Sequence, residues 1–112
     1  MKKIIVTGSC GFIGFNLIHN LNENIEVIGL DSLNDAYDSR FKELRKKILE
    51  KKQNFKFHQI DLSDIGTLDK NSQIFENCDT IVHLAAEHSD RVFPTSLYEK
   101  VNVEGTKNIC LI

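Results

Sequence analysis

The sequence lacks a long apolar run, a paired cysteine pattern and a large net charge. No apolar run approaches the roughly 20 residues of a membrane helix, and Lys2-Lys3 lead directly into a short strand pattern. A net charge of −2 gives no overall attraction to nucleic acid or to an anionic membrane. Cys10, Cys78 and Cys110 form no Cys-x-x-Cys pair, which favours free thiols in the cytoplasm. Neither a nucleic-acid partner nor a membrane is expected.

Short apolar segments alternate with helical patterns along the 112 residues. Strands are predicted over residues 2–6, 25–30, 55–60 and 80–85, and helices over 12–22, 39–52, 65–71 and from about 96. Short strands joined by helical crossovers are typical of a parallel sheet with right-handed connections. The predicted fold class is therefore α/β, with a parallel sheet of about four strands and helices on both faces.

Apolar periodicity predicts which side of each element is buried. The residues expected to face the core are Ile13, Leu17 and Leu21 in the first helix, and Phe41, Leu44, Ile48 and Leu49 in the second. The many lysines and arginines of the second helix could form a patch for nucleic acid or an anionic ligand. A solvated outer face is the favoured interpretation. Segment 80–85 has the most buried character of the four strands.

Three glycines follow the first strand at the spacing G-x-x-G-x-x-G and open the first helix. Gly8 would let the chain turn sharply, Gly11 would leave room for phosphate oxygens, and Gly14 would let the helix lie close to the strand. The unpaired N–H groups of the first helical turn carry a partial positive charge of roughly half a unit. This arrangement predicts a turn that holds the diphosphate of a dinucleotide.

Acidic and small residues follow the other strands. Asp31 ends the second strand, where a carboxylate can accept hydrogen bonds from adenosine ribose hydroxyls. It would also repel a 2′-phosphate, and no Arg or Lys occupies the next few positions, so NAD is favoured over NADP. Asp61-Leu62 could contact adenine, and Ala85-Ala86 are small enough to let the backbone pass near a cofactor. All lie at carboxyl ends of strands, where open α/β sheets bind ligands.

Other side chains that could carry chemistry have simpler explanations. Cys10 lies inside the glycine turn, where a reactive thiol is less favoured than a small residue that fills a tight loop. His83 is expected to be a hydrogen-bonded core residue rather than a ligand. Glu87, His88 and Asp90 share no helix or strand face, so no metal site is predicted.

Five motifs together resemble the extended short-chain dehydrogenase/reductases, and within them the NAD-dependent nucleotide-sugar epimerases and dehydratases. The motifs are Thr7-Gly8-x-x-Gly11-Phe12-Ile13-Gly14, Asp31-Ser32-Leu33-Asn34-Asp35, Asp61-Leu62, His83-Leu84-Ala85-Ala86 and Asn102-Val103-x-Gly105-Thr106-x-Asn108. The resemblance runs along the whole chain, with the motifs in the expected order. It implies a Rossmann-type fold and a tightly held NAD, which oxidises a sugar hydroxyl and later returns the hydride.

The resemblance also implies which residues contact the cofactor. Carried onto this sequence, they are Gly8, Gly11, Phe12, Ile13, Gly14, Asp31, Ser32, Asp61, Leu62, Ala85 and Ala86. Asn102 would help hold sheet and helix in register near the nicotinamide end. Ser32 replaces an asparagine often found after this aspartate, and residues 87–91 differ from the small, neutral residues common after the paired alanines. The first difference affects one adenosine contact, and the second predicts that the loop facing nicotinamide and substrate serves an unusual sugar.

Enzymes of this family resemble one another in a Ser/Thr and a Tyr-x-x-x-Lys pair, in which Lys lowers the Tyr pKa so that the phenolate acts as general base. Here Tyr37 is followed at i+4 by Phe41, and Tyr98 by Asn102, so the pair is absent and no catalytic residue is assigned. Residues 1–112 are thus interpreted as an NAD-binding Rossmann half domain without the substrate domain. The sequence ends at Ile112 inside an apolar helical pattern, as if cut off.

Three functions remain open. The chain could be the NAD-binding part of an epimerase or dehydratase that is inactive alone, a stand-alone nucleotide-binding or regulatory module, or a structural remnant that binds no cofactor. An apolar fourth strand without a neighbour would leave an open edge. A homo-oligomer formed through residues 80–85 and the exposed face of the last helix is therefore expected.

Overall fold

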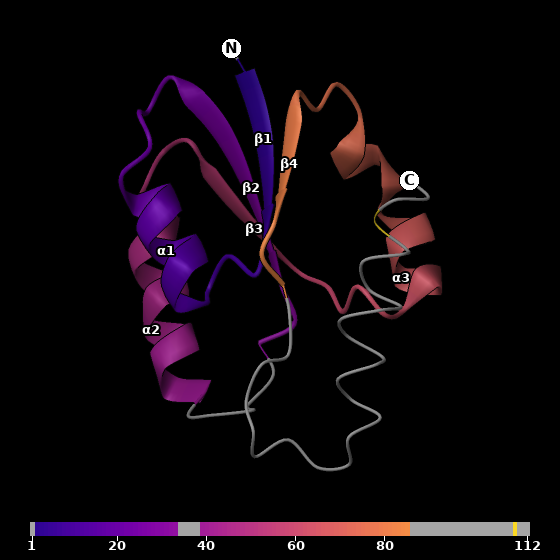
Figure 1. Cartoon of the computed structure of the whole chain (residues 1–112), viewed down its shortest axis with the longest axis horizontal. Helices are drawn as coiled ribbons and strands as arrows, with labels where there is room; N and C mark the ends of the chain where they lie inside the picture. Colours follow the sequence, from indigo (N-terminus) through magenta and orange to yellow (C-terminus); the bar gives the residue numbers. More distant parts are fainter. Residues whose placement is uncertain (1, 34–38, 86–108, 110–112) are drawn as a thin grey trace.

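The computed structural model describes residues 2–33, 39–85 and 109. The strands are β1 (Lys2–Thr7), β2 (Ile25–Asp31), β3 (Phe55–Gln59) and β4 (Thr80–His83), and the helices are α1 (Phe12–His19), α2 (Ser39–Glu50), α3 (Ile65–Lys70) and the 3-10 helix η1 (Ser72–Phe75). All strand pairs are parallel and the order is β3-β2-β1-β4. Figure 1 shows α1 and α2 on one face of the sheet and α3 on the other. The predicted α/β fold with a parallel sheet is confirmed.

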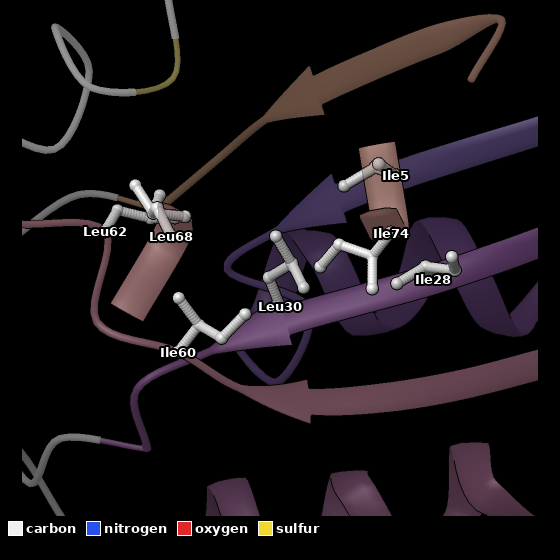
Figure 2. Close-up of a cluster of buried hydrophobic side chains, with 7 residues drawn as sticks. All are labelled: Ile5, Ile28, Leu30, Ile60, Leu62, Leu68 and Ile74. Carbon is white, nitrogen blue, oxygen red and sulfur yellow. The ribbon is translucent and has the colours of Figure 1, made fainter. Parts of the chain in front are cut away.

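Strand β1 lies inside the sheet and contributes to the core on both faces. Neighbouring side chains of a strand point to opposite faces, and a parallel strand covered on both sides is apolar throughout. Ile5 and Val6 are both fully buried, but Ile5 joins a cluster on the α3 side and Val6 a cluster on the α1 and α2 side. Figure 2 shows the first cluster, which consists of Ile5, Ile28, Leu30, Ile60, Leu62, Leu68 and Ile74.

Helix α1 faces the sheet with a different side from the one predicted. Gly14 and Ile18 are buried, whereas Ile13 is 68% exposed, so its assignment to the core was wrong. Gly14 is the reason. Because it has no side chain, it can lie against the turn at Gly8 and Ser9, and this orientation of the helix turns Ile13 away from the core. Leu17 and Leu21, as predicted, pack partly buried against the core. The helix ends at His19, earlier than predicted.

Helix α2 also differs from the prediction in the side that it buries. Leu49 is fully buried as expected and Ile48 is half-buried. Phe41 and Leu44, however, are 55% and 57% exposed, so their prediction as core residues was wrong. The side of α2 that faces α1 and β3 carries cationic side chains instead.

Lys46 of α2 and Lys52, two residues after its end, place their ammonium groups against neighbouring elements. Lys52 Nζ lies 3.4 Å from the carbonyl oxygen of His19 and 3.3 Å from that of Leu21, at the C-terminal end of α1. A cation is favourable there because helix C-termini carry partial negative charge. Lys46 Nζ lies 5.2 Å from the centre of the Phe57 ring. The favoured interpretation of the basic cluster as a solvated outer face is thus wrong for these residues.

Strand β4 is shorter and more exposed than predicted. It ends at His83, Thr80 is exposed, and Ile81 is 37% exposed, so its assignment as the most buried strand was wrong. The reason is its position, because within the described residues β4 pairs only with β1. Of the predicted last helix, only Ile109 is described; it is helical and packs partly buried against the cluster of Figure 2. Residues 34–38 of the predicted loop also lie outside the described residues.

None of the described helices has the length and apolar character that crossing a membrane requires. The two longest, α2 and α1, contain 12 and 8 residues. A helix needs about 20 apolar residues to span the hydrocarbon core.

The close approach of α1 to the glycine turn can be tested with matched glycine substitutions. A Cβ atom at Gly14 would collide with the carbonyl oxygen of Gly8 and lie 3.1 Å from Ser9 Cα. Gly14→Ala is therefore expected to lower the free energy of unfolding by about 1–3 kcal/mol in urea denaturation. Gly66→Ala in α3 is the control, because its Cβ would meet only Asp64 Oδ1 at 3.4 Å. It should raise that free energy by about 0.5–1 kcal/mol. Equal effects of the two would contradict the packing described.

Candidate functional site

The glycine turn is fastened between the carboxyl ends of β2 and β4. The N–H groups of Gly8 and Ser9 both donate to the carbonyl oxygen of Leu30, at 2.8 and 3.3 Å. Gly8 has a φ of +70°, a conformation that glycine adopts without steric cost. A Cβ on Gly8 would lie 2.9 Å from the backbone of Leu84 and Ala85. Only glycine therefore fits, and the turn lies at the edge of the sheet where parallel α/β folds bind ligands.

The N-terminal end of α1 follows the glycine turn directly. Gly11 is the N-cap residue and provides no side-chain hydrogen bond, and the first turn contains no acidic residue. The first N–H groups of a helix have no partner within the helix, and they attract an anion. Phe12 and Ile13 flank this end and are largely exposed. The predicted residues Gly8, Gly11, Phe12, Ile13 and Gly14 thus surround one helix terminus suited to an anion.

Asp31 lies beside the turn, as the ligand hypothesis requires. Its side chain is nearly buried, and its Oδ2 accepts the N–H of Cys10 at 3.0 Å. Its Oδ1 accepts the N–H of Leu33 at 2.8 Å and lies 3.4 Å from Lys42 Nζ in a salt bridge. The carboxylate is therefore held in one orientation next to the N-terminal end of α1.

Two cations from α2 were not assigned to the site by sequence reasoning. Lys42 forms the salt bridge with Asp31, and an Arg45 N–H donates to the carbonyl oxygen of Cys10 at 3.2 Å. The Arg45 guanidinium also lies 6.0 Å from the centre of the Phe12 ring. The signal in the sequence was the basic cluster of the second helix. Its anionic-ligand interpretation had been the less favoured one.

The side chain of Cys10 packs inside the glycine turn. Its side chain is fully buried, and its pKa is raised to about 12 by loss of solvent and by the nearby Asp31 carboxylate. A thiol with such a pKa is protonated at physiological pH and is a poor nucleophile. The favoured interpretation of Cys10 as a small residue filling the loop agrees with this environment.

Thr7 and His83 connect the ends of β1 and β4. The Thr7 hydroxyl oxygen accepts the N–H groups of Leu84 and Ala85 at 2.9 and 3.1 Å and lies 2.6 Å from His83 Nδ1. Because both of its acceptor positions are filled, its hydrogen must point to His83 Nδ1, which leaves the ring proton on Nε2. Burial lowers the pKa of His83, which also favours the neutral ring. His83 is a hydrogen-bonded residue, as expected.

The remaining predicted residues lie at the ends of β3 and β4. The N–H of Ile60 donates to the carbonyl oxygen of Asp31 at 3.1 Å, which brings the segment with Asp61 to the same rim. Asp61 is exposed, and its Oδ1 accepts both the N–H and the hydroxyl of Ser63, at 2.9 and 2.6 Å. Leu62 is buried in the cluster of Figure 2, so little of its side chain faces the rim.

Ser32 and Ala85 are half-buried, and the carbonyl oxygen of Ser32 accepts a hydrogen bond from Gln59 at 3.3 Å. Ala86 and Asn102 lie outside the described residues, as do the acidic and histidine side chains of segment 87–90. In the part of the chain that the structure describes, no group of three or more His, Cys, Asp or Glu side chains could hold a metal ion.

Residues 4–111 match the family described as "NAD dependent epimerase/dehydratase family". The chain belongs to this family. The match covers nearly the whole chain and includes the glycine turn, Asp31 and the ends of all four strands.

Individual family members are similar over the same region. The chain is 43% identical to an uncharacterized protein of Methanocaldococcus jannaschii, with 96% of this chain and 34% of that protein covered. It is 39% identical to the UDP-glucuronate 4-epimerase of Thermodesulfobacterium geofontis, with 97% and 34% covered. A crystal structure of UDP-glucuronic acid 4-epimerase from Bacillus cereus, in complex with UDP-glucuronic acid and NAD, superposes with a TM-score of 0.82 at 29% identity. The superposition covers 96% of this chain and 34% of that one. The chain thus spans about a third of the length of these family members.

The burial of His83 predicts a pH dependence of stability. Because the pKa of His83 is lowered in the folded chain, the unfolded chain binds a proton first as the pH falls below about 6.5. The free energy of unfolding is expected to decrease between about pH 7 and 5, and His83→Gln should flatten this decrease. His19→Gln, which changes an exposed histidine, should leave it intact. Identical pH profiles for His83→Gln and the unmodified chain in urea denaturation would rule out this contribution.

Proposed function

We propose that this chain binds NAD and forms the NAD-binding portion of a nucleotide-sugar epimerase or dehydratase. The observation that carries the proposal is the hydrogen bond of 3.0 Å between the Asp31 carboxylate and the N–H of Cys10 in the glycine turn. It brings a ribose-binding carboxylate and an anion-binding helix terminus together at one rim of the sheet. These are the two features that a dinucleotide needs for its adenosine and its diphosphate.

The charges around the turn support a bound diphosphate. The N-terminal end of α1 is partly positive and has no acidic residue in its first turn. Arg45 adds a full positive charge beside Phe12, the first residue of this helix. Both the helix N-terminus and Arg45 attract an anion. A diphosphate at this position would supply that anion.

The chain's own part in the reaction is to bind and orient the cofactor. NAD, when bound, accepts a hydride from a sugar carbon and returns it. Asp31 would hold the adenosine ribose, and the turn from Gly8 to Gly14 would hold the diphosphate. The sequence has no Tyr-x-x-x-Lys pair to take the proton from the sugar hydroxyl. We therefore propose that these 112 residues alone bind NAD without turnover.

Two further parts of the proposal concern the longer protein. UDP-glucuronate epimerases are among the similar proteins, and the Bacillus cereus enzyme was crystallised with UDP-glucuronic acid. We therefore propose a UDP-sugar as the substrate class of any longer form. A cytoplasmic location agrees with the free thiols of Cys10 and Cys78.

Calorimetric titration of the folded chain with NAD, ADP and NADP tests the cofactor assignment. NAD and ADP are expected to bind, and NADP more weakly, because the Asp31 carboxylate repels a 2′-phosphate and the Lys42 ammonium paired with it offsets this repulsion only in part. Gly11→Ala should weaken NAD and ADP by roughly tenfold or more, since its methyl group would occupy the space of phosphate oxygens. The Cβ atom of an alanine at position 11 would lie 3.3 Å from the Gly8 carbonyl oxygen. This contact is tight but needs only a small shift, so the turn should still form.

Gly66→Ala is the matched control, because Gly66 lies on α3 across the sheet and its substitution should not change the affinity. A folded chain that binds neither NAD nor ADP would instead favour a structural remnant. Binding of both ligands without an effect of Gly11→Ala would place them elsewhere on the molecule.

We also propose that two copies of the chain associate through the outer edge of β4. Among the described residues this edge faces no other strand, and an unpaired edge offers N–H and C=O groups to another chain. Ile81 adds a partly exposed apolar side chain at this strand.

Sedimentation velocity over a range of concentrations tests this association. The chain is expected to form dimers or larger species, and Ile81→Lys should shift it toward monomer, because edge lysines oppose strand pairing. Ile65→Lys is the control, since Ile65 is also an exposed apolar residue but belongs to α3 and not to the edge strand. A monomer at all concentrations, or equal effects of both substitutions, would disprove association through β4.

A further inference from the structure

We propose that the ion pair of Asp31 and Lys42 recognises both hydroxyl groups of the adenosine ribose, one hydroxyl by each residue. This inference rests on the proposed function and deepens it. It assigns a ligand contact to a lysine of α2, 11 positions after the aspartate.

The carboxylate of Asp31 has too few acceptor positions left for both hydroxyls. A carboxylate offers about four lone-pair sites. Oδ1 accepts the N–H of Leu33 and contacts Lys42, while Oδ2 accepts the N–H of Cys10. The contacts of the described residues thus leave one site, on Oδ2, so Asp31 can accept one ribose hydroxyl. The adjacent hydroxyl needs a different partner.

Lys42 has the donors that the second hydroxyl needs. An ammonium group carries three N–H donors, and the described contact of Lys42 uses one of them, on Asp31 Oδ1 at 3.4 Å. Its side chain is 13% exposed and that of Asp31 is 3% exposed, so the pair is held in place yet not sealed. A hydroxyl oxygen next to Asp31 can accept a hydrogen bond from such an ammonium group.

The surroundings keep Lys42 in this position. Arg45, one turn further along α2, binds the Cys10 carbonyl oxygen and so fastens the helix to the glycine turn. Arg45 thus contacts Cys10 and Lys42 contacts Asp31, and the N–H of Cys10 in turn binds the Asp31 carboxylate. The ammonium group is therefore placed by the same contacts that place the carboxylate.

Binding of ADP, 2′-deoxy-ADP and 3′-deoxy-ADP to the unmodified chain and to Lys42→Met tests the proposal by calorimetry. In the unmodified chain each deoxy analogue is expected to bind about 3–20-fold more weakly than ADP, since each lacks one hydrogen-bonded hydroxyl. In Lys42→Met, the analogue that lacks the hydroxyl bound by Lys42 should bind as well as ADP does, because in this variant that hydroxyl of ADP no longer has a partner. The other analogue should still bind more weakly than ADP.

Two further variants separate ribose recognition from a general effect of the charge. Lys42→Arg should restore the discrimination against both analogues, because it keeps the cation and its donors. Lys46→Met, one turn along the same helix, should behave as the unmodified chain, because Lys46 contacts the Phe57 ring instead.

Each outcome decides the question. If Lys42→Met weakens all three ligands by the same factor, Lys42 acts only through its charge or through the fold, and the inference is wrong while NAD binding stands. If both deoxy analogues bind to the unmodified chain as well as ADP does, neither hydroxyl is recognised, and the inference also fails. If the folded chain binds none of the three ligands, the proposed function fails together with the inference.

Discussion

The hydrogen bond from the Cys10 N–H to the Asp31 carboxylate is the contact on which the site depends. It joins the glycine turn, which follows β1, to the last residue of β2. The same carboxylate accepts the N–H of Leu33 and pairs with Lys42 of α2, so three segments meet on one side chain. A buried carboxylate is stable only when such partners compensate for its lost hydration. The turn therefore depends on β2 and α2 as much as on its own glycines.

Much of the architecture and part of the site could be predicted from the sequence. The alternation of apolar strands with helical patterns correctly predicted a parallel sheet, and the placement of the glycines correctly predicted a turn between a strand and a helix. The approach of Asp31 to this turn followed from a general property of parallel sheets, in which the carboxyl ends of the strands share one edge. These features depend on residues that are close in sequence or on a rule common to the fold class.

The wrong predictions of buried residues have a common physical cause, which is that the burial of a side chain depends on what its helix or strand packs against. Apolar periodicity placed Phe41 and Leu44 in the core, but α2 faces backbone carbonyl groups and a carboxylate, which are better partners for cations. Segment 80–85 was apolar enough for an inner strand, but burial of a strand depends on whether a neighbour lies on each side. Neither partner surface is visible in the local sequence. Ile13 was misplaced for the same reason, since Gly14 needed contact with the turn.

The crowding around Gly8 bears on how such a chain can change over generations. No larger residue fits at this position, because the backbone of Leu84 and Ala85 occupies the space of its Cβ atom. The turn is thus closed to gradual variation. Lys42 and Arg45, in contrast, reach Asp31 and the turn through long side chains that can be replaced without a clash of the kind found at Gly8. Mutational drift in ligand preference is therefore more open to α2 than to Gly8.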